Sequence, residues 1–169
     1  MKTLLVLRHA KASQDSPSGL DFDRPLKPRG RSQALALGRM MRIRNLTIDA
    51  IVASPAARVV ETVSGLLKGT GESIEPAFDH RLYNASPEAL IDVIRAFDNT
   101  VERLLIVGHN PGLQYLVLRL AGTDNHGLRC EVAAGFPTAM LAEVRLAVER
   151  WQDVAPGSGR IANLIRPDD

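Results

Sequence analysis

Cysteine, aromatic residues and long apolar runs are all scarce in this sequence, and each scarcity excludes a class of protein. The single cysteine, Cys130, cannot form an internal disulfide, so the fold does not depend on an oxidising compartment. We expect Cys130 to be a buried structural thiol rather than a nucleophile. The longest apolar runs are too short to cross a bilayer, and the N-terminus lacks a signal-peptide pattern. A cytoplasmic protein without membrane contact is therefore expected.

Charge of either sign is nearly balanced, which argues against a nucleic-acid surface. The chain has 21 Lys and Arg against 19 Asp and Glu, and aromatic residues make up 4% of it. Nucleic-acid-binding surfaces usually show clustered basic residues or aromatic rings on which bases stack, and neither pattern is present. A small anionic ligand in a locally basic pocket would still fit. The 169 residues contain no linker or repeat, which predicts one domain spanning 1–169, with a monomer favoured.

Short apolar runs alternate with stretches of helical periodicity. Buried strands are predicted at 3–7, 49–53 and 104–107, and weaker strands at 73–77, 139–148 and 161–165. Helices are predicted at 28–44, after an N-cap at Ser54 with Pro55 in the first turn, and after Ser86-Pro87. A further helix is predicted from Pro111 to Gly122, with Asn110 as its cap. The segments 10–27 and 123–137 are predicted loops. This alternation favours a three-layer α/β/α fold with a mostly parallel central sheet.

Three short polar motifs lie where three predicted strands end. They are Arg8-His9, Ser54 to Arg58, and Gly108-His109-Asn110. Such folds bind ligands at the carboxyl ends of their parallel strands, so these motifs should meet in one cleft. The planar fork of arginine pairs with phosphate oxygens, and the helix that begins after His109 also favours an anion. A phosphoryl group is therefore the expected ligand.

His9 is the predicted nucleophile of this cleft. Neutral imidazole attacks phosphorus well, and a histidine with an ordinary pKa near 6.5 is largely unprotonated at cytoplasmic pH. The attack would phosphorylate His9, and water would then hydrolyse the intermediate. Electrostatic stabilisation of the spread negative charge should supply most of the rate.

A metal site is the alternative use of two histidines. A third ligand with recognisable spacing is missing, and only coincidence would supply one from Asp15, Asp21, Asp23 or Glu61. We expect neither a metal nor another cofactor. The remaining two histidines, His80 and His126, are expected to be structural or surface residues.

The three motifs together resemble those of the histidine phosphatase superfamily. Leu7-Arg8-His9-Ala10 is similar to its Arg-His-Gly signature, the stretch 54–62 to its second motif, and Gly108-His109-Asn110 to its third. They occur in the expected order and span most of the chain. Ala10 replaces the usual glycine, and Ala53 stands where a second serine is common, but neither change removes a catalytic side chain.

This resemblance implies a phosphoglycerate mutase-like fold and a metal-independent phosphatase. It implies that His9 becomes phosphorylated and that the phosphoryl group is bound by Arg8, Arg58 and His109. Asn110 is a weaker candidate for substrate contact.

Further residues narrow the resemblance to the short SixA-like phosphohistidine phosphatase branch. They are Asp23-Arg24-Pro25-Leu26, Gly30 with Gln33-Ala34, and Phe136-Pro137-Thr138-Ala139. The implied substrate is a phosphorylated histidine of a protein, such as a helical phosphotransfer domain in signal transduction. Arg24 either helps at the rim of the site or is a plain surface arginine.

One departure from the superfamily concerns the proton donor. Many relatives carry a glutamate shortly after the third strand, where this chain has Asn84, and an amide cannot serve as a general acid. An imidazole leaves phosphorus more easily than a sugar alkoxide does, so this departure favours a phosphoramidate substrate. The proton donor stays unknown; carboxyl and imidazole groups that could supply it are Asp15, Asp21, Asp23, Asp79, His80 and Glu88.

Two other functions remain open. The first is a phosphatase of small phosphate monoesters or nucleotide-derived metabolites. The second is a phosphate- or phosphoprotein-binding module without turnover, against which the intact set of His9, Arg8, Arg58 and His109 argues.

Overall fold

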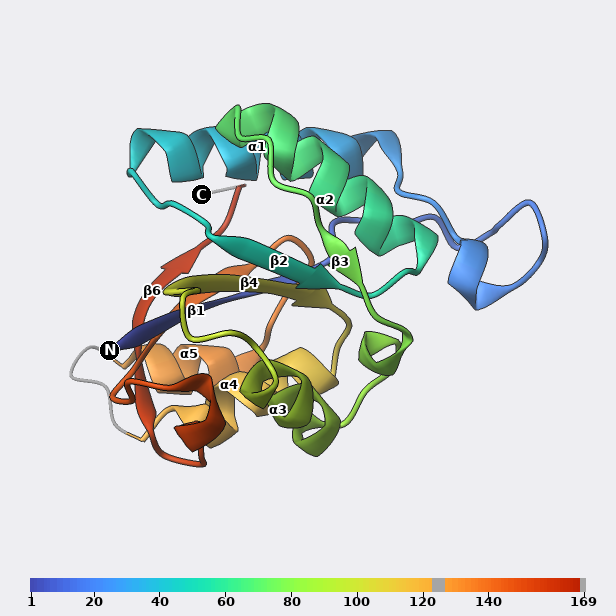
Figure 1. Cartoon of the computed structure of the whole chain (residues 1–169). Helices are drawn as coiled ribbons and strands as arrows, with labels where there is room; N and C mark the ends of the chain where they lie inside the picture. The colour runs from blue at the N-terminus through green and yellow to red at the C-terminus, as the bar shows by residue number, and fades with distance from the viewer. Residues whose placement is uncertain (123–126, 168–169) are drawn as a thin grey trace.

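The chain folds into a central β-sheet with helices on both of its faces (Figure 1). The computed structural model describes residues 1–122 and 127–167. The strands are β1 Lys2–Arg8, β2 Ala50–Ala53, β3 Ala77–Phe78, β4 Arg103–Gly108, β5 Leu141–Leu146 and β6 Gly159–Ile165. The α-helices are α1 Pro28–Ile43, α2 Ala57–Thr70, α3 Pro87–Arg95, α4 Gly112–Leu120 and α5 Leu128–Ala134. Short 3-10 helices are η1 Asp21–Asp23, η2 His80–Leu82 and η3 Trp151–Asp153.

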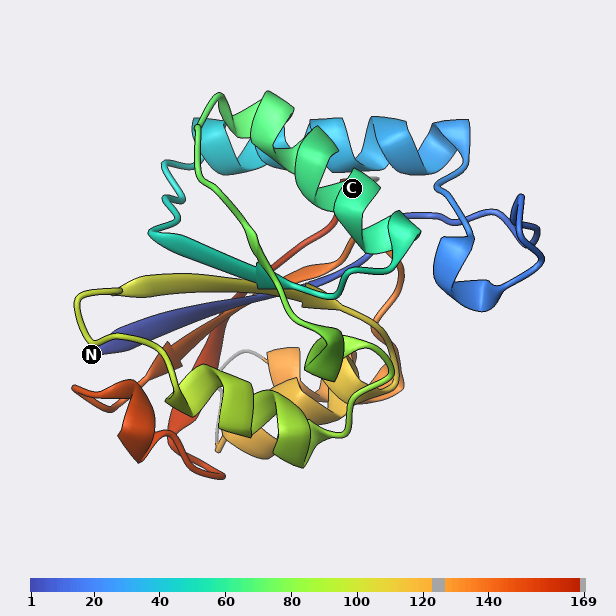
Figure 2. The same ribbon diagram turned by 45° about the vertical axis from the view of Figure 1, so that its right-hand side comes forward.

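The helices form the two outer layers of the fold. Helices α1 and α2 cover one face of the sheet, and α3, α4 and α5 lie on the other, as two views show (Figures 1 and 2). The predicted three-layer α/β/α fold is confirmed. Among the described residues, no helix combines the length and apolarity that a bilayer crossing requires.

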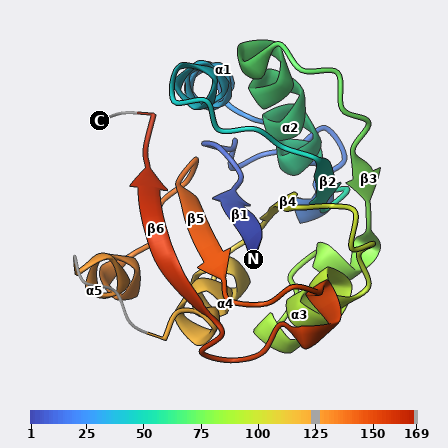
Figure 3. The ribbon, with the colours of Figure 1, turned by 60° about the vertical axis from the view of Figure 1, so that its left-hand side comes forward.

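The strand order of the sheet is β3-β2-β4-β1-β5-β6 (Figure 3). The neighbours from β3 to β1 pair in parallel, whereas β5 runs antiparallel to both β1 and β6. The prediction of a mostly parallel sheet is therefore confirmed. Because β2, β4 and β1 are adjacent and point the same way, their carboxyl ends share one edge of the sheet.

The sheet is buried on both faces, which explains its continuous apolar strands. In β1, Leu4 and Val6 pack into the cluster beneath α3 and α4, while Leu5 and Leu7 pack into the cluster beneath α1 and α2. All four side chains have no exposed surface. A parallel strand covered on both sides needs apolar residues at every position. Its sequence is therefore a continuous apolar run rather than an alternation of apolar and polar residues.

Helices α1 and α2 touch through glycines. A Cβ atom at Gly38 would lie 2.2 Å from the carbonyl oxygen of Leu66, and one at Gly69 would lie 2.4 Å from that of Leu35. Any side chain at either glycine would force the helix backbones apart. The close contact fixes α2, whose first turn carries Arg58, against α1.

The prediction of a loop over 123–137 is wrong for the part that the structure describes. Helix α5 occupies Leu128–Ala134, and only Val132 in it is buried. The single buried residue leaves no apolar stripe by which the sequence could show a helix. Cys130 lies on the outer face of α5 and is exposed, so the prediction of a buried thiol is also wrong. Residues 123–126, and the expectation for His126 with them, lie outside the described residues.

Two helix starts are displaced from their predicted positions. Ser54 is not an N-cap: α2 begins at Ala57, after an N-cap at Ala56. Helix α4 begins at Gly112 and ends at Leu120, rather than running from Pro111 to Gly122. Ser54 bonds to His109 instead, whereas the side-chain oxygen of Asn110 still accepts from the backbone nitrogen of Gln114 in the first turn of α4 at 3.3 Å.

Three weaker strands also differ in extent from the prediction. The strand expected at 73–77 lies at Ala77–Phe78, the one expected at 139–148 is confined to Leu141–Leu146, and the last begins at Gly159 rather than at 161. Backbone pairing with a neighbouring strand sets these limits, and pairing leaves no local mark in a sequence.

Candidate active site

The three predicted motifs emerge side by side at one edge of the sheet. In the parallel register, Arg8 lies opposite Gly108, and Ala53 lies opposite Val107. The next residue on each strand therefore enters the same space. These residues are His9 after β1, Ser54 after β2 and His109 after β4.

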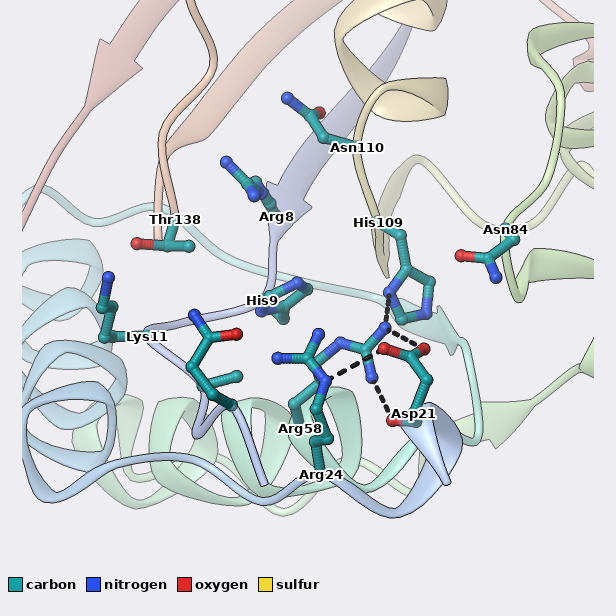
Figure 4. A pocket seen from close by; sticks show the side chains of 12 residues that line it. Arg8, His9, Lys11, Asp21, Arg24, Arg58, Asn84, His109, Asn110 and Thr138 are labelled. Atoms are coloured by element: carbon teal, nitrogen blue, oxygen red, sulfur yellow. Dashed lines mark hydrogen bonds and ion pairs between the residues drawn. The ribbon is translucent and has the colours of Figure 1, made fainter. Parts of the chain in front are cut away.

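These strand ends open into a cleft of about 480 Å³ (Figure 4). It is lined by Arg8, His9, Lys11, Ala12, Gln14, Asp21, Arg24, Arg58, Asn84, His109, Asn110 and Thr138. The structure thus brings together all six residues that the sequence nominates for the site. Their individual roles stay predictions.

His9 is held with one ring nitrogen free. Its Nδ1 atom lies 2.8 Å from the carbonyl oxygen of Ala10. A carbonyl oxygen can only accept, so Nδ1 carries the proton and Nε2 keeps its lone pair. Burial and the neighbouring Arg58 and Arg8 guanidinium groups lower the pKa of His9 to about 4. The ring is therefore neutral at pH 7 and chemically able to attack an electrophile.

His109 is fixed from both sides of its ring. Its Nδ1 lies 3.2 Å from Nη2 of Arg58, which always donates, so Nδ1 is an acceptor. Its Nε2 therefore carries the proton and donates to the hydroxyl of Ser54 at 2.8 Å. Burial, Arg58 and His9 lower the pKa of His109 to about 3. The two imidazole rings lie 5.5 Å apart, measured between centroids.

Two arginines of the cleft wall are held by oxygen atoms of the protein. Arg58 donates from Nη1 to the backbone oxygen of Asp21 at 2.8 Å and from Nη2 to its carboxylate at 3.0 Å. Arg8 donates from Nη1 to the carbonyl oxygen of Phe136 at 3.0 Å. The Nε atoms of both arginines are buried, and neither has a hydrogen-bond partner among the described residues. A buried donor without an acceptor is costly, and an oxyanion would satisfy both donors.

The two weaker candidates occupy opposite sides of the cleft (Figure 4). Arg24 donates from Nε to the carboxylate of Asp21 at 2.9 Å and from Nη1 to the carbonyl oxygen of Ser13 at 2.7 Å. Asn110 donates to the carbonyl oxygen of Phe136 at 3.1 Å. Both side chains are held by the protein and contribute polar atoms to the cleft wall.

Comparison with known proteins agrees with this geometry. The sequence model of the histidine phosphatase superfamily (branch 1) matches residues 4–86. An uncharacterized protein of Mycobacterium tuberculosis is 35% identical to this chain. The aligned region covers 95% of this chain and 99% of the length of that protein. The chain belongs to the histidine phosphatase superfamily.

Solved structures extend the match to the full length of the fold. A candidate SixA phosphohistidine phosphatase from Agrobacterium tumefaciens is 27% identical, with a TM-score of 0.82 and 98% of each chain covered. A second candidate SixA protein, from Nakamurella multipartitia, is 26% identical and superposes with a TM-score of 0.86. The superposition covers 99% of this chain and 97% of that protein's chain. The chain lies in the SixA-like branch of the superfamily and has its phosphoglycerate mutase-like fold.

Several residues of the superfamily motifs serve to hold the site together. The hydroxyl of Thr62 accepts from the backbone nitrogen of Ala10 at 3.0 Å and donates to the carbonyl oxygen of Arg58 at 2.6 Å. Thr62 thus links the segment after His9 to the helix that carries Arg58. Both Thr62 and Arg58 are buried.

Two residues of the SixA-like motif brace the segment beyond His9. A Cβ atom at Gly30 would lie 2.1 Å from the carbonyl oxygen of Lys11, so only glycine fits there. The side chain of Gln33 accepts from the backbone nitrogen of Lys11 at 3.0 Å. Helix α1 therefore supports the backbone that follows His9.

Sequence reasoning missed three residues of this histidine phosphatase site. The sequence predicts that Ser54 caps a helix, offers Asp21 only as a proton donor or chance metal ligand, and indicates no role for Tyr83. The hydroxyl of Tyr83 donates to the carboxylate of Asp21 at 2.5 Å, and its ring meets that of His109 edge-on at 5.3 Å. The partners are far apart in the chain, so the position of Ser54 after a strand was the only local signal.

Among the residues that the structure describes, the cleft offers a single carboxylate, that of Asp21. Hydrogen bonds from Tyr83, Arg58 and Arg24 lower the pKa of Asp21 to about 2, so it is ionised at neutral pH and holds no proton to donate. Of the other candidates, Asp79 is paired with Arg81 and Glu88 with Arg119, and both pairings lower the carboxyl pKa.

Asn84 does line the cleft, as the resemblance implied for the position of the usual acid. Its backbone is left-handed, with φ of 52°, a conformation that asparagine and aspartate tolerate. Among residues 1–122 and 127–167, no group of three or more His, Cys, Asp or Glu side chains could hold a metal ion.

Proposed function

We propose that this protein is a phosphatase that transfers a phosphoryl group to Nε2 of His9 and then to water. The observation that carries the proposal is the state of His9: its Nδ1 is tied to a carbonyl oxygen, and its free Nε2 opens into a cleft with unpaired guanidinium donors. A neutral nucleophile beside preorganised cations is what phosphoryl transfer requires.

The reaction has two displacements at phosphorus. In the first, the lone pair of His9 Nε2 forms an N–P bond while the bond from phosphorus to the leaving group breaks. In the second, water attacks the phosphorylated imidazole, the N–P bond breaks, and inorganic phosphate leaves. His9 returns to its neutral form with Nδ1 still donating to Ala10.

Arg8 and Arg58 supply the electrostatic part of catalysis. Each presents a buried Nε donor without a partner in the described structure, and each keeps its remaining bonds to protein oxygens. The guanidinium groups therefore need no reorganisation when negative charge spreads over the phosphoryl oxygens. His109, held by Ser54, forms the wall beside the nucleophile.

The substrate we propose is the phosphorylated histidine of a protein. The cleft continues into neighbouring hollows of about 430, 410 and 260 Å³, which share Arg24, Asn84 and Thr138 with it. An open site of this kind admits a side chain on a large partner. The absence of a protonated carboxyl group in the cleft also favours a leaving group that needs little protonation. Two structural relatives are candidate phosphohistidine phosphatases.

A rate comparison tests this substrate assignment. The purified protein, without added metal, is given a phosphohistidine-bearing phosphotransfer domain, free phosphohistidine, and sugar and nucleotide monophosphates. We expect the highest kcat/KM on the phosphorylated domain. A clear preference for a small monoester would assign the same chemistry to a metabolite phosphatase, and hydrolysis of none of them would favour a binding module.

A further inference from the structure

Asp21 places a negative charge inside a site built for an anion. Its carboxylate accepts from Tyr83 and Arg58 on Oδ2 and from Arg24 on Oδ1. Its backbone oxygen accepts from Nη1 of Arg58. The residue therefore binds the outer edge of Arg58 twice and connects η1, α2 and the segment after η2.

The arrangement has two effects that act in opposite directions. It holds Arg58 by both terminal nitrogens, so the buried Nε is the guanidinium donor left without a partner among the described residues. It also offsets part of the positive charge that Arg8, Arg24, Arg58 and Lys11 bring to the cleft. The Asp21 side chain is 51% exposed, whereas that of Arg58 is 4% exposed, so solvent weakens this offset without removing it.

We infer that Asp21 is a counter-charge that keeps Arg58 in position while weakening the hold of the site on inorganic phosphate. The inference rests on the proposed function, because phosphate is then the product that must leave after each turnover. An enzyme that bound this product as tightly as four uncompensated cations allow would be inhibited by it. Asp21 is accordingly a positioning residue that also sets product affinity.

Binding of inorganic phosphate, measured by calorimetry, separates the charge of Asp21 from its shape. Asp21→Asn keeps an oxygen for Arg58 and Tyr83 but removes the charge. We expect its Kd for phosphate to fall about three- to tenfold at low ionic strength, and the difference to shrink in high salt. Inorganic phosphate should become a correspondingly stronger inhibitor, with kcat and KM falling together. Asp21→Ala, which also releases Arg58, should bind phosphate less tightly than Asp21→Asn.

Asp23→Asn is the matched control, because it makes the same change of charge on the same short helix. Its carboxylate accepts from Ser18 and does not line the cleft. We expect its phosphate affinity to stay within about twofold of wild type, since exposed charges at a distance are screened. Should Asp21→Asn prove unstable, Asp21→Ser carries the same loss of charge.

Two outcomes overturn the inference. They are an unchanged or weaker phosphate affinity in Asp21→Asn, and an equal tightening in Asp23→Asn. Failure of the proposed function looks different: the wild-type protein would then hydrolyse none of the phosphorylated substrates, whatever its affinity for phosphate.

Discussion

The Nε2 atom of His109 donates to the hydroxyl of Ser54 over 2.8 Å, and this bond fixes which nitrogen of the imidazole carries the proton. Ser54 is fully buried at the end of β2, so no water replaces it as an acceptor. The same hydroxyl accepts from the backbone nitrogen of Ala56 at 3.3 Å, which ties the start of α2 to the histidine.

Replacing Ser54 by alanine should impair both catalysis and folding. A buried donor that loses its acceptor costs about 1–3 kcal/mol of folding stability, and we expect kcat/KM to fall about ten- to a hundredfold because His109 reorients. Steady-state kinetics and a thermal melt measure the two effects. Ser86→Ala is the control, because Ser86 caps α3 and its loss should lower stability by about 1 kcal/mol without changing kcat/KM. Full activity in Ser54→Ala would show that His109 needs no such support.

Arg58→Ala should lose on the order of 3 kcal/mol of transition-state stabilisation, or about a hundredfold in kcat/KM. Arg58→Lys should recover little of this loss, because an ammonium group cannot bond to Asp21, His109 and a phosphoryl oxygen in one plane. Kinetics on a phosphoramidate substrate measure both variants. Near wild-type activity in either would remove Arg58 from the proposed clamp.

Acid should destabilise the protein through its two buried histidines. The folded-state pKa values are about 4 for His9 and about 3 for His109, against about 6.5 in an unfolded chain. Below pH 6.5 the two histidines are protonated in the unfolded chain but stay neutral in the folded protein. The free energy of unfolding therefore decreases as the pH falls from 6.5 toward 4. The loss should be on the order of 3 kcal/mol for each group.

Denaturant melts between pH 4 and pH 7 measure this loss. His9→Asn should flatten the pH dependence, because it removes one of the two groups whose pKa burial lowers. Phosphate or orthovanadate should also reduce the loss of folding stability at low pH, because a bound anion favours the protonated imidazoles. An equally steep pH dependence in His9→Asn would contradict the assigned pKa of His9.

Asn84→Asp should shift the preference of the enzyme toward monoesters. Asn84 lines the cleft at a left-handed position that aspartate also tolerates, and an added carboxyl group can protonate an alkoxide leaving group. We expect the ratio of kcat/KM for a sugar phosphate over a phosphoramidate to rise about tenfold. Asn84→Ala, which adds no carboxyl group, should leave the ratio unchanged. A ratio that does not move in Asn84→Asp would show that Asn84 does not occupy the position of the acid.

The layers of the fold and the meeting of the strand-end motifs were predictable from local pattern. Doubly covered strands such as 104–107 appear as apolar runs, and polar residues that directly follow adjacent parallel strands must share an edge. The cleft residues carry chemistry in their side chains, so His9, Arg58 and His109 are recognisable by type and position.

The rest depends on contacts that no local pattern records. Asp21 bonds to Arg58 and Tyr83, which lie 37 and 62 positions away in the sequence. The sequence of segment 10–27 does not indicate which of its side chains contacts the cleft. Ser54 followed by proline resembles a helix cap, and capping is the commoner use of such a serine. The structure instead engages its hydroxyl with a histidine 55 positions away.

Rapid quenching during turnover tests the central proposal most directly. Wild-type protein mixed with a labelled phosphoramidate is stopped within milliseconds, and the site of the label is located by mass spectrometry. We expect a phosphoryl group on His9 that is stable in base and lost in acid, and we expect neither label nor turnover in a folded His9→Ala. A labelled residue other than His9, or undiminished turnover in His9→Ala, would contradict the proposal.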